Sequence, residues 1–133
     1  MVNMALQRKT WSAVTGGFVF AQLMAANPAS AAEGDIGPVY IERVAVIGIA
    51  SGGHNAGDFQ IQIKGGFTVP TGMTCDSNFI TTLKSVDADR RMLTMATTAQ
   101  VTKQPVYLRI TDVPAYTAFG GRCSLVWVNL ASS

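Results

Sequence analysis

DADRRMLTMATTAQVTKQPVYLRI, the stretch from Asp87 to Ile110, decides the fold because it predicts a helix that leads directly into a strand. Apolar or small residues recur in its first half at steps of four and three, which lines one face of a helix: Ala88, Met92, Met95, Ala99 and Thr102. The carboxylate of Asp87 can accept the unpaired backbone N–H groups of the first turn. A helix that begins at about Asp87 and Ala88 is therefore expected.

The second half of this stretch predicts a strand. Pro105 cannot continue a helix interior, but it is tolerated as the first residue of a strand. The residues that follow alternate between apolar and polar side chains, with the period of a half-buried strand: Val106, Leu108 and Ile110 against Tyr107, Arg109 and Thr111.

The N-terminal residues 1–32 have the pattern of a signal peptide. Arg8 and Lys9 form a short positive region, and the uncharged run Trp11–Ala26 follows, with its apolar core at Phe18–Ala26. Ala29–Ala31 supplies the small residues that precede a cleavage site, with cleavage after Ala31 or Ala32. The alternative is a membrane anchor, but the run is shorter than the ~20 residues that span a bilayer. We expect a secreted or periplasmic bacterial protein with no membrane span after cleavage.

The remaining residues 33–133 have the size of one domain and carry no net charge. The ten lysines and arginines include Arg8 and Lys9, so eight remain against eight acidic residues. A neutral domain lacks the cationic surface that drives phosphate binding, so nucleic acid is not expected as a partner. Cys75 and Cys123 predict a disulfide, because two cysteines in a small exported domain usually pair. The alternatives are a metal site or a reactive thiol, and the only histidine available as a further soft ligand is His54.

The order of elements predicts a mainly β fold with one helix. After a loose lead-in at Glu33–Gly37, strands are expected in runs 38–49, 59–63 (with an extension over 67–69), 79–83, 106–111 and 122–130, with the helix between the third and the fourth. The first run is apolar in both phases, which favours burial on both faces and a bend at Gly48. Strand, strand, strand, helix, strand, strand is the order of the OB-fold, a five-stranded barrel. The competing interpretation is a twisted antiparallel sheet with the helix on one face.

A family resemblance accompanies this order. A helix rich in small residues, a polar step, a Pro-Val pair and an alternating strand, here Met92–Ile110, resemble the B subunits of subtilase cytotoxin and typhoid toxin. The signal peptide, the chain length and a cysteine in the last strand agree with it. The resemblance implies an OB-fold, a pentameric ring, host-glycan binding and an A-subunit-like partner.

Two loops are the candidate binding region, because OB-folds hold ligands with the loops joining strands 1–2 and 4–5. These are residues 51–58 and 112–122, and together they supply aromatic rings and hydrogen-bonding groups that suit a sugar: His54, Asn55, Asp58, Tyr116, Phe119 and Arg122. The structural alternative is that the two aromatic side chains only fasten their loop to the barrel.

No catalytic, metal or cofactor site is expected. His54 with Asp58 lacks a nucleophile or a third ligand nearby in sequence, and Asp87 with Asp89 is better explained by helix capping. The serines and threonines fit no hydrolase motif. Two functions remain: a glycan-binding, toxin-B-subunit-like protein, or a structural or inhibitory periplasmic protein that binds another protein through a sheet edge.

Overall fold

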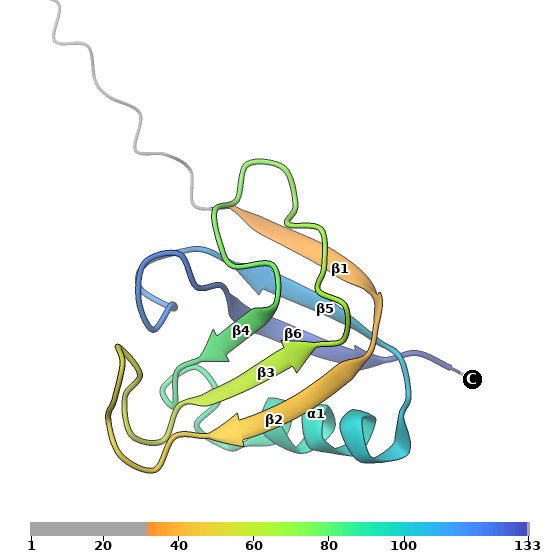
Figure 1. Ribbon diagram of the computed structural model, residues 1–133, viewed down its shortest axis with the longest axis horizontal. Coiled ribbons are helices and arrows are strands. Elements are labelled where there is room, and N and C mark those ends of the chain that lie inside the picture. The colour runs from red at the N-terminus through yellow and green to blue at the C-terminus, as the bar shows by residue number, and fades with distance from the viewer. Residues whose placement is uncertain (1–31, 133) are drawn as a thin grey trace, which may run out of the picture.

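The computed structural model describes residues 32–132, so the predicted signal peptide, except for Ala32, lies outside the described residues. Within this range the elements follow in the order β1 Glu33–Val39, β2 Ile41–Val46, β3 Phe59–Ile63, β4 Phe79–Thr82, α1 Arg91–Thr102, β5 Val106–Thr111 and β6 Ser124–Leu130. Figure 1 shows the strands in two layers, with α1 at the bottom of the view. The prediction of a mainly β chain with one helix is confirmed.

Two antiparallel sheets of three strands each make up the β structure of residues 32–132. One has the order β1-β5-β6 and the other the order β2-β3-β4. Tyr40 alone separates β1 from β2, so the two form one bent run that pairs first with β5 and then with β3. The bend lies at Gly37–Tyr40 rather than at Gly48, where the sequence predicts it. This shared run joins the two sheets.

One hydrophobic core lies between the sheets and α1. The fully buried apolar side chains come from both sheets: Phe59, Ile61, Ile63, Ile80, Val106, Leu108, Ile110 and Leu125. Ala96 and Ala99 of α1 are buried, and Met92 and Met95 pack against the core while partly exposed. The predicted alternation is confirmed for β3 and for β5 as far as Ile110, because each strand turns one face to this core. Thr111, which the pattern places on the outer face of β5, is buried as well.

The helix begins at Arg91, later than its sequence pattern predicts. Arg90 has a left-handed backbone (φ 58°, ψ 23°), which a right-handed helix cannot include, and Ala88 lies outside α1. The carboxylate of Asp87 nevertheless accepts the backbone N–H groups of Met92 at 3.0 Å and Leu93 at 2.9 Å. Asp87 therefore caps the first turn as predicted, but from four residues before the helix.

The prediction of a loose lead-in at Glu33–Gly37 is wrong, because this segment is most of β1. It pairs with β5 from Glu33 opposite Thr111 to Ile36 opposite Leu108. The segment consists mostly of polar residues and glycine, so its sequence does not alternate between apolar and polar residues. Its side chains nevertheless face opposite sides of the sheet, with Ile36 buried and Asp35 exposed. The segment is ordered by its partner strand rather than by its own composition.

Bulges also change which side chains face the core. Between Ile41 and Arg43 the register with β3 shifts, so β2 is not buried on both faces and Val46 is 56% exposed. Val126 is an extra residue in β6, since Arg109 pairs with Trp127 and Ile110 with Leu125. Each bulge reverses the facing of the residues that follow it. The expected strand at residues 67–69 is absent from the structure.

The predicted disulfide between Cys75 and Cys123 is present, with a Cα–Cα distance of 5.4 Å. It joins the loop before β4 to the residue before β6. Beside it, the backbone N–H of Thr81 donates to the Cys123 carbonyl at 3.0 Å, and the N–H of Leu125 donates to the Thr82 hydroxyl at 3.3 Å. We call these contacts the β4–β6 seam, because they connect the far strands of the two sheets.

Candidate functional site

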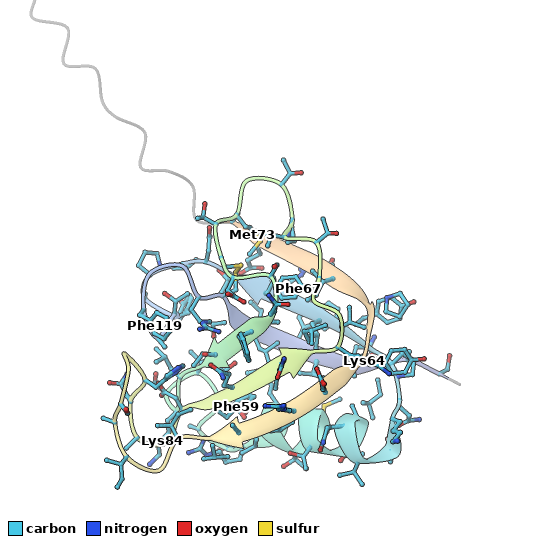
Figure 2. All side chains as sticks on the ribbon, in the orientation of Figure 1. Phe59, Lys64, Phe67, Met73, Lys84 and Phe119 are labelled. Carbon is cyan, nitrogen blue, oxygen red and sulfur yellow. A yellow bond between two sulfur atoms is a disulfide. The ribbon has the colours of Figure 1, made fainter. Side chains whose placement is uncertain are left out.

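The two loops that the sequence singles out contact each other at one end of the molecule. The ring of His54 meets the ring of Phe119 edge-on, with centroids 5.0 Å apart. Figure 2 shows Phe119 on the loop before β6, above the loop that joins β2 and β3. Gly53 permits this approach, because it has φ +87° and a Cβ there would lie 3.1 Å from the Phe119 ring. The expected meeting of these two loops is therefore found.

Behind this contact, Arg122 lies between two aromatic rings. Its guanidinium carbon is 5.1 Å from the centroid of Phe119 and 5.2 Å from the centroid of Phe79. Such cation–π contacts stabilise a positive charge by about 0.5–2 kcal/mol. Nε and Nη1 of Arg122 are buried and make no hydrogen bond to the described residues. The side chain is thus held mainly by the two rings.

Asp58 has a structural role in this region. Its side chain is buried, and its carboxylate accepts the backbone N–H groups of Asn55 at 3.0 Å and Lys84 at 3.1 Å. The guanidinium of Arg90 also donates to the carbonyl of Gly57. These bonds fasten the loop 47–58 to the segment before α1. Asp58 is therefore not available to a ligand, contrary to its place among the candidate residues.

Tyr116 and Asn55 are the candidate residues most open to solvent. Tyr116 is 51% exposed, and Asn55 is exposed at the tip of its loop. Phe119, in contrast, contacts both His54 and Arg122, as the structural alternative predicts for it. The exposed part of the two-loop region therefore offers a phenol ring and an amide, the groups that stack on and hydrogen-bond to sugars.

The sequence did not point to Asp76 or Phe79, which complete this region. Asp76 accepts the backbone N–H groups of Asn78 and Phe79, and these bonds, the first foremost, lower its pKa, with a smaller contribution from the charge of Arg122. The disulfide is the signal that could have found both residues. Because Cys75 is bonded to the neighbour of Arg122, the residues that follow Cys75 start close to Arg122.

No group of three or more His, Cys, Asp or Glu side chains that could hold a metal ion occurs in the part of the chain that the structure describes. The groups that the two-loop region presents are aromatic rings, an amide and a clamped cation, all of which can make non-covalent contacts with a ligand.

Comparisons with known proteins identify no relative of this chain. No protein-family model matches the sequence, and neither the curated proteins nor the solved structures contain a significant match. The resemblance to toxin B subunits therefore stays a prediction, supported by the residues that suggested it.

Proposed function

We propose that this chain is an exported, non-catalytic glycan-binding domain with an OB-type barrel. The pairings of the strands support the barrel. If β1 and β2 are counted as one bent strand, this strand pairs with β3 and with β5. β4 then pairs with the other edge of β3, and β6 pairs with the other edge of β5. The hydrogen bonds of the β4–β6 seam link the two remaining strands, and they support the proposal that the five strands close into a barrel.

The contact between the two loops carries the proposal of a glycan site. It joins two loops that are far apart in the sequence, and Tyr116 and Asn55 of these loops remain exposed. Exposed aromatic rings and hydrogen-bonding groups on loops that contact each other suit a sugar ligand. The disulfide fits export to an oxidising compartment, and the neutral charge of residues 33–133 fits a ligand without phosphate.

A glycan array probed with residues 33–133 tests this function. We expect at least one glycan to bind, and Tyr116→Ala and Asn55→Ala to weaken binding about 5- to 100-fold, since stacking and one or two hydrogen bonds contribute about 1–3 kcal/mol. Tyr40→Ala is the matched control, because Tyr40 is 48% exposed but lies between β1 and β2. Binding that is equal in all three variants would remove this site, and no binding at all would remove the function.

The second candidate function is protein binding through the edge of β2. This strand has a partner only on its β3 side within its sheet, and the apolar side chain of Val46 at its end is 56% exposed; Ile49, in the loop that follows, is 84% exposed. Unpaired edges with exposed apolar groups are templates for another chain. The same edge is the candidate contact for the pentameric ring, and for an A-subunit-like partner, that the toxin resemblance implies.

The mass measured by light scattering distinguishes a ring of several chains from a monomer. A constitutive ring gives a mass several times that of one chain at all concentrations, and Val46→Lys should reduce that mass by placing a charge on the edge. Thr98→Lys is the control, because Thr98 is exposed on α1 rather than on a strand. A concentration-independent monomer would exclude the ring.

A further inference from the structure

The outer face of the β1-β5-β6 sheet carries a second group of aromatic and polar side chains. Asp35, Arg109 and Trp127 stand opposite one another on the three strands, because Asp35 pairs with Arg109 and Arg109 with Trp127. In the neighbouring row, Tyr107 pairs with Asn129. All five side chains are at least partly exposed. None of them belongs to the two-loop region.

The first row is pre-organised. Nε and Nη2 of Arg109 donate to the two carboxylate oxygens of Asp35, both at 2.8 Å. The guanidinium carbon also lies 5.6 Å from the ring centroid of Trp127. A bidentate pair fixes the plane of both groups, and it leaves Nη1 and the outer carboxylate lone pairs outside the pair. The row therefore presents a donor and acceptors in fixed positions.

The ring of Tyr107 in the second row is held beside β1. Gly37 has φ +131°, and a Cβ at that position would lie 3.0 Å from both the Cα and the Cδ1 of Tyr107. The missing side chain at Gly37 therefore makes room for the ring. Even so, Tyr107 is 41% exposed, so one part of the ring faces solvent next to Asn129.

The pair has the bidentate geometry in which an exposed ion pair can stabilise a sheet. The side chains of Arg109 and Asp35 are nevertheless 39% and 54% exposed, so the pair is also open to a ligand. The charges of Arg109 and Asp35 cancel, but the charge of the exposed Glu33 on the same strand also acts on Arg109, so the face is slightly negative and disfavours an anion. The face thus combines aromatic rings with fixed hydrogen-bonding groups, which is complementary to a neutral polyol rather than to an acidic sugar.

We propose that this outer face binds a neutral sugar unit, with Tyr107 stacking on the ring and Asp35, Arg109 and Asn129 bonding to its hydroxyl groups. The inference rests on the proposed glycan-binding function and adds a second surface and a ligand class to it. Because the two surfaces lie on different elements, one glycan chain or two separate glycans can occupy them.

The experiment uses an array of neutral oligosaccharides built from glucose, galactose and N-acetylhexosamines, together with sialylated forms of the same glycans. Binders are then titrated against residues 33–133 with Tyr107→Ala and Asp35→Asn, beside Tyr116→Ala from the loop region and Tyr40→Ala as the exposed control. Circular dichroism verifies that each variant is folded. We expect the two sheet-face variants to weaken binding of a neutral glycan about tenfold or more, and the control to leave it unchanged.

The outcomes separate this inference from the function on which it rests. Loss of neutral-glycan binding only in Tyr116→Ala, or binding only of sialylated forms, overturns the sheet-face site and leaves glycan binding intact. No binding by any glycan overturns both. Loss of binding in Tyr107→Ala and Asp35→Asn, with Tyr116→Ala unchanged, supports the sheet face and removes the loop site.

Discussion

Replacing Asp87 with alanine tests how α1 is held in place. The carboxylate is 5% exposed and accepts the first-turn N–H groups of Met92 and Leu93. Hydrogen bonds to a charged acceptor contribute about 1.5–3 kcal/mol each, whereas loss of a helix cap costs about 0.5–2 kcal/mol because water replaces part of it. Since the site is partly buried, we expect a loss of about 2–3 kcal/mol in the free energy of unfolding.

Asp89→Ala is the matched control for this change. Asp89 lies two residues away, its side chain is 75% exposed, and it forms an ion pair with the exposed Arg91 at 3.5 Å. Its loss should cost less than about 0.5 kcal/mol. Asp87→Asn should fall between the two, because an amide keeps only one acceptor oxygen.

Urea unfolding followed by circular dichroism measures all three variants, and thermal unfolding should show a Tm about 10 °C lower for Asp87→Ala. Equal free energies of unfolding for Asp87→Ala and Asp89→Ala would refute the assignment of Asp87 as the cap of α1.

Two further predictions concern the loop before β4. Replacing Cys75 and Cys123 together with serine should lower the free energy of unfolding by about 4 kcal/mol, because the bond closes a loop with a sequence separation of 48; a change below about 1 kcal/mol in urea unfolding would contradict this. The lowered pKa of Asp76, due first to the N–H of Asn78 and then to that of Phe79, means that the carboxylate contributes stability above its unfolded-state pKa and loses it as the pH falls through its folded-state pKa. Asp76→Asn should therefore flatten the fall in Tm below about pH 4, and an unchanged acid profile would argue against this contribution.

The sequence predicts those parts of the fold in which one residue type repeats along one face. β3 is of this kind, with Phe59, Ile61 and Ile63 inward. The disulfide could also be predicted, because the chain has only two cysteines to pair. The position of a bulge could not be predicted, because one extra residue reverses every later side chain without altering composition. For that reason the exposure of Val46 and the facing of Trp127 do not follow from the alternation of their strands.

The candidate site shows the same division. Loop positions follow from the order of the elements, so the meeting of His54 and Phe119 could be expected. The role of Asp58 could not, since its partner Lys84 lies 26 residues away and contributes only a backbone N–H. Any residue type would supply that group. The row of Asp35, Arg109 and Trp127 on the outer sheet face could not be predicted from the sequence, because Asp35 lies in a segment without an apolar pattern of its own.

The pairing of β1 with β5 determines the order in which this chain can fold. β2, β3 and β4 follow one another in sequence and form their sheet from local contacts, whereas Asp35 meets Arg109 across 74 residues. Long-range pairing is slow, since a large loop must close before it forms. During synthesis, which begins at the N-terminus, β1 is therefore exposed before its partner exists. It can pair with β5 only after α1 and β5 have been made. Until then the strand is an open edge, and a chain that ends before residue 106 would leave it available to a second copy.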